Sequence, residues 1–166
     1  AKSDFEKYFE RWLPNRVEKG DDVIVYFAGH GAAAPDTGKA YLVPFDGDPE
    51  YLEQTAYPLD RLYENLAKLP ARKITVVMDS CFSGTGSRAV VAANARPLIS
   101  VKIANVPTNI ILLAAAAKDQ TSQAYEDVGH GLFTYFLLRS LKDQARDGTI
   151  DIQAAFETAA PMVSRI

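Results

Sequence analysis

A histidine and a cysteine follow two strand-like segments of the chain at equivalent positions. His30 comes two residues after the apolar run 23–28, and Cys81 comes three residues after the run 74–78. A thiolate beside an imidazole can carry out nucleophilic acyl transfer, because the imidazole lowers the pKa of the thiol and passes a proton to a leaving amine. A lone cysteine or histidine is usually structural. The two together at matching strand ends favour a catalytic pair.

The segments that must position this pair predict a parallel sheet. The runs 23–28, 74–78 and 110–114 are continuous and apolar, as in strands that are buried on both faces. Helical spacing of apolar residues predicts helices over 5–13, 59–69, 133–141 and 152–160. We expect Ser3 or Asp4 to cap the first helix and the first strand to stop at Gly29-His30-Gly31. A short strand is expected over 41–44, and 88–106 reads as mostly loop. The fold class is therefore α/β, a three-layer α/β/α sandwich.

The carboxyl ends of neighbouring parallel strands meet at one edge of a sheet, where ligand sites lie. If the strands 23–28 and 74–78 are neighbours, about 4.8 Å apart, then His30 and Cys81 project into one cleft. Gly31 would let the backbone approach a substrate closely. The N–H groups of Gly31 and Cys81 would then form an oxyanion hole.

The composition excludes several classes of protein. The chain has 166 residues, 48% of them hydrophobic, which is the make-up of one globular domain. Its net charge of −3 argues against nucleic-acid or anionic-membrane partners, and its apolar runs are shorter than the roughly 20 residues of a membrane span. Cys81 is the single cysteine, so an intrachain disulfide is excluded. We expect a soluble, cytoplasmic domain without a cofactor or a metal ion.

Three other motifs compete with this interpretation. The stretch 83–86 could hold a phosphate, although such loops usually follow the first strand of a sheet. Cys81 and Arg88 resemble the C-x5-R loop of cysteine phosphatases, but six residues intervene here. The acidic groups 46–48 and Asp143, Asp147 and Asp151 match no twelve-residue calcium loop and read as solvated turns. They leave calcium activation undecided.

The two segments Tyr26-Phe27-Ala28-Gly29-His30-Gly31 and Asp79-Ser80-Cys81-Phe82-Ser83-Gly84 carry a family resemblance. They resemble the paired catalytic motifs of the caspase-like cysteine peptidases, peptidase family C14, and above all those of metacaspases and their bacterial relatives. A histidine about 50 residues before the cysteine is the caspase spacing. The stretches 41–46 and 129–135 also recur in the family, so the resemblance covers nearly the whole chain. It implies a caspase-haemoglobinase-like fold, with Cys81 as nucleophile, His30 as its partner and Gly31 in the oxyanion hole.

The substrate pocket implied by the resemblance is acidic. Where caspases have Gln in their Q-A-C motif, this chain has Asp79, whose carboxylate would repel an acidic side chain and attract a cation. The stretch 123–126 resembles a paracaspase segment, which implies that Glu126 forms a second acidic wall. Ala28 and Tyr125 are expected to line the same site. The substrate is then a protein or peptide with Arg or Lys before the scissile bond, and Arg is favoured because its planar fork can meet two carboxylates.

The resemblance also implies the extent of the domain. Residues 1–166 are expected to form one catalytic domain that lacks the first strands of the family fold, so an upstream segment or a second chain would complete the sheet. Family members often cut themselves in the stretch after the nucleophile. We therefore expect a processing loop over 84–108, with cleavage after Arg88 or Arg96.

The sequence thus predicts a metacaspase-like cysteine endopeptidase that cleaves after Arg or Lys and that could process itself. The alternative is a catalytically silent caspase-like interaction domain. A thiol-directed probe that contains Arg distinguishes the two, because a binding module would not react with it rapidly.

Overall fold

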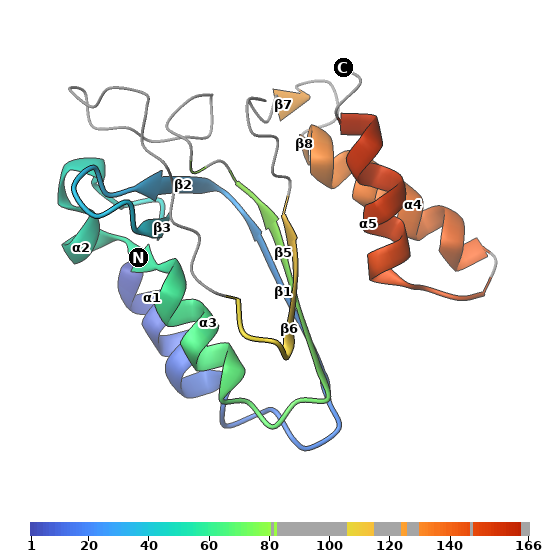
Figure 1. Cartoon of the computed structure of the whole chain (residues 1–166), viewed down its shortest axis with the longest axis horizontal. Coiled ribbons are helices and arrows are strands. Elements are labelled where there is room, and N and C mark those ends of the chain that lie inside the picture. Colours follow the sequence, from blue (N-terminus) through green and yellow to red (C-terminus); the bar gives the residue numbers. More distant parts are fainter. Residues whose placement is uncertain (81, 83–105, 115–123, 126–129, 147, 164–166) are drawn as a thin grey trace.

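A computed structural model (Figure 1) describes residues 1–80, 82, 106–114, 124–125, 130–146 and 148–163. Its central sheet has three parallel strands in the order β1-β5-β6. Their bounds are Asp22–Ala28, Lys73–Asp79 and Ile110–Ala114. These are the three strands that the apolar runs predict, so the prediction of a parallel sheet is confirmed.

Helices cover both faces of this sheet (Figure 1). On one face lie α1 (Lys2–Lys7), the short π-helical segment η1 (Tyr8–Trp12) and α3 (Leu59–Ala67), and on the other face lie α4 (Leu132–Arg146) and α5 (Ile152–Val163). Side chains alternate between the two faces of each strand, so the sheet contributes residues to an apolar core on each face. Val76 packs toward α3, whereas Val77 packs toward α4 and α5. The predicted α/β/α layering is confirmed.

A second, antiparallel sheet corrects one prediction. The chain does not turn into a loop after β1, because β2 (His30–Ala33) follows at once and pairs with β3 (Ala40–Val43). β3 also pairs with β4 (Tyr57–Pro58). The glycines around His30 predict a break in the strand, and the break is a bend at Gly29 that leads into a new sheet. Two short helices, η2 (Pro49–Tyr51) and α2 (Leu52–Thr55), and the strand pair β7 (Ala124–Tyr125) and β8 (His130–Gly131) complete the described elements.

The start of the first helix also differs from the prediction. Helix α1 begins at Lys2 with Ala1 as its N-cap residue, so Ser3 and Asp4 lie inside the helix. The Asp4 carboxylate accepts a hydrogen bond of 2.8 Å from the amino group of Ala1, which places an acidic side chain in the first turn where the helix dipole favours it.

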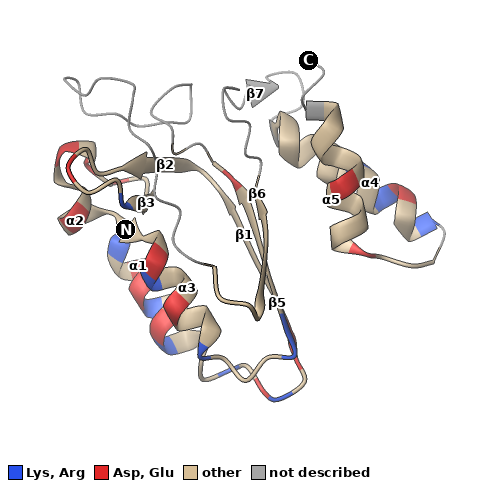
Figure 2. Cartoon of the chain, in the orientation of Figure 1, with Lys and Arg blue, Asp and Glu red and all other residues tan. Residues whose placement is uncertain are grey.

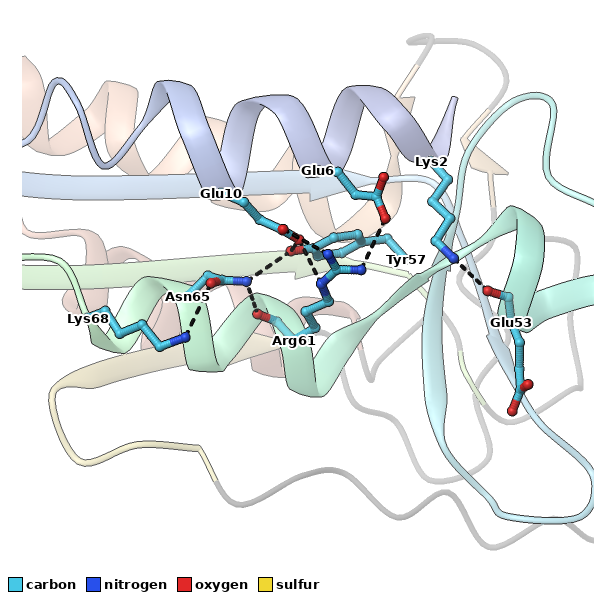
Figure 3. A network of polar contacts seen from close by, with 8 residues as sticks. All are labelled: Lys2, Glu6, Glu10, Glu53, Tyr57, Arg61, Asn65 and Lys68. Carbon is cyan, nitrogen blue, oxygen red and sulfur yellow. Dashed lines mark hydrogen bonds and ion pairs between the residues drawn. The ribbon is translucent and has the colours of Figure 1, made fainter.

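Polar contacts hold the first helix against α3 (Figure 3). Arg61 binds Glu6 at 3.0 Å and Glu10 at 2.7 Å. The hydroxyl of the fully buried Tyr57 donates to Glu10 at 2.9 Å. Burial, together with this bond, raises the pKa of Tyr57. Next to this network, Phe5 and Phe9 pack on the Tyr57 ring, so the first helix has both apolar and polar anchors.

Among the described strands, β1 lies at an edge of the central sheet and pairs only with β5. Its Ile24 and Tyr26 side chains are 62% and 49% exposed, whereas its Val23 and Val25 side chains are buried. One face of β1 is therefore covered by α1 and α3, and the other is covered only in part. In the described part of the chain, no helix has both the length and the apolar character that a membrane crossing requires.

Candidate active site

The carboxyl ends of β1 and β5 are joined in register. Ala28 lies opposite Asp79, and the Gly29 N–H donates to the Asp79 carbonyl oxygen at 3.3 Å. This pairing corresponds to an offset of 51 residues between the two strands, which is also the spacing between His30 and Cys81 in the sequence. The expectation that the strands 23–28 and 74–78 are neighbours is therefore confirmed.

The structure brings four of the predicted site residues to this edge of the sheet. Ala28 is the exposed last residue of β1, and Asp79 is the last residue of β5. His30 is exposed and lies opposite Val43 at the start of β2, where it lines a pocket of about 580 Å³. Gly31 is buried opposite Leu42.

Asp79 is an acidic side chain at the end of a strand whose interior is apolar. The charges of β1 and β5 lie at the strand ends (Figure 2). Asp79 is fully buried, and its Oδ2 accepts a hydrogen bond from the Thr134 hydroxyl in the first turn of α4. Such a buried carboxylate is costly unless hydrogen bonds hold it. The contact with α4 therefore fixes the position of this carboxylate.

A second hydroxyl extends this contact. The Tyr26 hydroxyl lies 2.7 Å from Thr134 Oγ1. Thr134 has one hydroxyl proton, which it donates to Asp79. Tyr26 must then donate to Thr134. The result is a directed chain of hydrogen bonds from β1 through α4 to the carboxylate at the end of β5.

Sequence reasoning missed Tyr26 and Thr134 as site residues. Both belong to motifs that the sequence singles out, since Tyr26 lies in the segment 26–31 and Thr134 in the segment 129–135. A polar residue on the covered side of an apolar helix was an available signal, because Thr134 lies between the buried residues Phe133 and Leu137. Its partner is 55 residues away in the chain, and no local pattern identifies such a partner.

Other predicted residues lie outside the described part of the chain. These are the nucleophile Cys81, the pocket residue Glu126, and Arg88 and Arg96 of the processing loop, of which residues 83–105 are not described. Tyr125 lies in β7, where it pairs with His130.

The acidic turns that were weighed as calcium ligands have local hydrogen bonds where they are described. Asp48 Oδ1 accepts from the Glu50 N–H at 2.9 Å, and Asp151 Oδ1 accepts from the Gln153 N–H at 2.8 Å. Asp143 lies 3.4 Å from Arg146. Among the described residues, no group of three or more His, Cys, Asp or Glu side chains is arranged to hold a metal ion.

The layered fold and the strand-end site are those of a caspase-like domain, and the family comparison agrees. The model of the caspase domain, peptidase family C14, matches residues 1–165. The chain therefore belongs to this family of cysteine peptidases.

Within the family, the chain is similar to fungal metacaspases. It is 31% identical over 88 residues to Metacaspase-1B of Aspergillus fumigatus and, over the same length, 31% identical to Metacaspase-1B of Neosartorya fischeri. Metacaspase-1B of Aspergillus oryzae is 28% identical over 90 residues. The match to the first two covers 45% of this chain and 20% of each relative, so the chain corresponds to about a fifth of their length.

Proposed function

We propose that this chain is a cysteine endopeptidase that cleaves peptide bonds after Arg or Lys through Cys81 and His30. The observation that carries the proposal is the register of β1 and β5. Their offset of 51 residues equals the spacing of His30 and Cys81. Each of the two residues therefore follows the last paired position, Ala28 or Asp79, by two residues.

The proposed reaction has two steps. The Cys81 thiolate attacks the substrate carbonyl while the N–H groups of Gly31 and Cys81 stabilise the oxyanion. His30 donates a proton to the leaving nitrogen as the C–N bond breaks, which releases the first product and leaves an acyl-enzyme. His30 then accepts a proton from water, and the resulting attack on the thioester releases the second product and regenerates the thiolate.

The proposed specificity depends on the carboxylate of Asp79. A substrate guanidinium or ammonium group would bind this carboxylate, which the Thr134 hydroxyl orients. An ionised carboxylate accepts several hydrogen bonds, so Asp79 can bind a cation while it accepts from Thr134. Glu126 would supply the second acidic wall, and Ala28 and Tyr125 would complete the pocket.

The test is cleavage of matched fluorogenic peptides that end in Arg, Lys or Asp before the scissile bond. We expect the wild-type chain to cleave the Arg and Lys peptides, and we expect Cys81→Ala and His30→Ala to lose this activity. Parallel assays with and without calcium determine whether the ion is required. Cleavage after Asp would contradict the role of Asp79, and activity that persists in Cys81→Ala would contradict the mechanism.

Self-processing follows from the same specificity. The chain carries Arg88 and Arg96 seven and fifteen residues after Cys81. If the enzyme cuts itself there, fragments should appear on electrophoresis for the wild type and not for Cys81→Ala. The double variant Arg88→Ala with Arg96→Ala should also remain intact. Unchanged fragments in the double variant would contradict processing at these two sites.

A further inference from the structure

The pocket beside His30 lies between the first helix and the chain that follows β3. Its walls include Phe5 of α1, Phe27 near the end of β1, and the residues Val43, Pro44 and Phe45. The volume of about 580 Å³ is large enough for an amino-acid side chain. These walls are apolar, and His30 is the imidazole at the border of the pocket. Ala1 and Asp4, whose amino group and carboxylate pair at 2.8 Å, also line it. Among the lining residues His30 and Ala28 have roles assigned above, and the apolar walls have none.

A tight turn holds Phe45 at the rim of the pocket. The Gly47 N–H donates to the Pro44 carbonyl oxygen at 2.9 Å. A Cβ atom at Gly47 would lie 2.7 Å from Val43 Cγ1 and 3.0 Å from the Pro44 carbonyl oxygen, so the turn requires glycine. At the tip of this turn the Phe45 side chain is fully exposed. A large aromatic side chain in this state offers apolar surface to a ligand.

Phe27, one wall of the pocket, and the Asp79 carboxylate lie on opposite faces of the central sheet, whereas Ala28, which pairs with Asp79, also lines the pocket. Phe27 packs with the core under α1 and α3, where the pocket is. Tyr26 and Asp79 contact Thr134 of α4 on the other face. This opposition follows from the alternation of side chains along a strand. A substrate that places its basic side chain at Asp79 and its scissile bond at His30 therefore continues toward the pocket.

We propose that this pocket is the subsite for the residue that follows the scissile bond and that it prefers a bulky apolar side chain. The inference rests on the proposed peptidase function. His30 must give its proton to the nitrogen of the leaving residue, so this residue has to lie against His30, which borders the pocket. When the C–N bond breaks, the nitrogen gains this proton, and the released peptide begins with the residue in the pocket. Phe5, Phe27 and Phe45 supply the apolar contacts.

Two quenched peptides test this subsite. They are identical except that Arg is followed by Phe in one and by Gly in the other. We expect the wild-type chain to have a higher kcat/KM for the Arg-Phe peptide, and we expect Phe45→Ala to lower the ratio of the two kcat/KM values about tenfold. Phe45 is exposed, so its replacement leaves the buried core intact. Tyr51→Ala is the matched control, because Tyr51 is an exposed aromatic residue outside the pocket and its loss should leave the ratio unchanged.

The outcomes separate the subsite from the peptidase function. Equal cleavage of the two peptides by the wild type, or a ratio that Phe45→Ala does not change, would overturn the subsite and leave the peptidase function standing. A wild-type chain that cleaves neither peptide would overturn both proposals.

Discussion

At the scale of single residues, the hydroxyl groups of Tyr26 and Thr134 control the position of the Asp79 carboxylate. Thr134 donates to Asp79, and Tyr26 donates to Thr134 over 2.7 Å. Asp79 and Thr134 are buried, whereas Tyr26 is about half exposed. The Asp79 carboxylate is thus bound by a buried hydroxyl group, and that hydroxyl group is bound by a tyrosine that is partly exposed.

Loss of the Thr134 hydroxyl should weaken binding of a basic substrate. Thr134→Val keeps the shape of the side chain but removes the donor to Asp79, and a hydrogen bond to a charged group contributes about 1.5–3 kcal/mol. We therefore predict a decrease of roughly 10- to 100-fold in kcat/KM for an Arg peptide, mainly through KM, and a smaller decrease for Tyr26→Phe.

Two further variants act as controls for the Thr134 substitution. Thr134→Ser retains the hydroxyl and should restore most of the activity. Thr158→Val removes an exposed hydroxyl on α5 that bonds the Ala154 carbonyl oxygen, and it should change little. If Thr134→Val cleaves the Arg peptide with an unchanged KM, Thr134 does not position the specificity carboxylate.

The sequence was sufficient to expect several site residues at one edge of the sheet, but it did not indicate the contacts of Asp79. His30 and Gly31 were identified because they directly follow a predicted strand, and Asp79 and Ala28 because of the family resemblance. Thr134 was not, since its contact to Asp79 depends on how α4 packs on the sheet, and this packing is set by apolar residues such as Phe133 and Leu137.

At the scale of elements, the network around Arg61 connects the first helix to α3. Arg61 meets Glu6 and Glu10, and its guanidinium lies 5.6 Å from the centre of the Tyr57 ring. Because two carboxylates and an aromatic ring share one arginine, this network should stabilise the fold more than an isolated surface pair does.

Arg61→Met should therefore lower the free energy of unfolding by about 1 kcal/mol. The matched control is Arg72→Met, because Arg72 is more exposed and, among the described residues, binds one carboxylate, that of Asp22, at 2.6 Å. Its loss should cost less than about 0.5 kcal/mol. Urea denaturation of the three chains measures both differences, and equal losses would show that the network adds nothing to a simple surface pair.

Tyr63, a buried tyrosine of α3, makes the free energy of unfolding depend on pH in the alkaline range. Burial, with a smaller contribution from Asp60, raises the pKa of Tyr63 to about 12. The neutral phenol is favoured in the folded chain, so its stabilising contribution is complete below pH 10, the ordinary pKa of tyrosine. It decreases as the pH rises toward 12, because the unfolded chain loses its proton first.

We predict that the free energy of unfolding falls between pH 10 and pH 12 and that Tyr63→Phe reduces this fall by on the order of 2 kcal/mol. Denaturation curves at pH 8, 10, 11 and 12 measure the effect. Tyr51→Phe is the control, because Tyr51 is exposed. Identical pH dependence in wild type and Tyr63→Phe would contradict the interpretation.

Long apolar runs were sufficient to predict the strands of the central sheet. The glycines around His30 were not sufficient to predict the strand β2. The run 74–78 is buried on both faces, as expected, and becomes the central strand. The run 23–28 also forms a strand, but Ile24 and Tyr26 on one of its faces are largely exposed, which differs from the expected burial on both faces. Around His30, the glycines predict a break, but the chain forms β2 because β3 offers it a hydrogen-bonding partner. This antiparallel pairing joins residues that are 7 to 13 positions apart, and the formation of such a strand depends on its partner more than on local propensity.

At the scale of the whole molecule, the outer edge of β1 is the surface where a further strand could pair. The Gly29 N–H points to β5, where it meets the Asp79 carbonyl oxygen. Since N–H directions alternate along a strand, those of Val25 and Phe27 also point to β5. The N–H groups of Ile24 and Tyr26 then point away from β5, to the side on which the described chain has no strand.

Hydrogen exchange followed by NMR should therefore alternate along β1. We expect slow exchange for the amides of Val25 and Phe27 and fast exchange for those of Ile24 and Tyr26. The amides of Val76 and Val77, in the central strand, should both exchange slowly and serve as the internal control. Slow exchange at Ile24 and Tyr26 would instead mean that another strand, such as one from a second copy of the chain, covers this edge.

The most direct measurement of the proposed chemistry is the mass of the adduct formed with a peptide chloromethyl ketone. A probe with Arg at its reactive end should alkylate Cys81, the single cysteine of the chain. The same probe with Asp should react at least tenfold more slowly, and His30→Ala should suppress the reaction. Equal labelling by both probes, or no labelling by either, would contradict a Cys81–His30 peptidase with an acidic pocket and would favour a silent interaction domain.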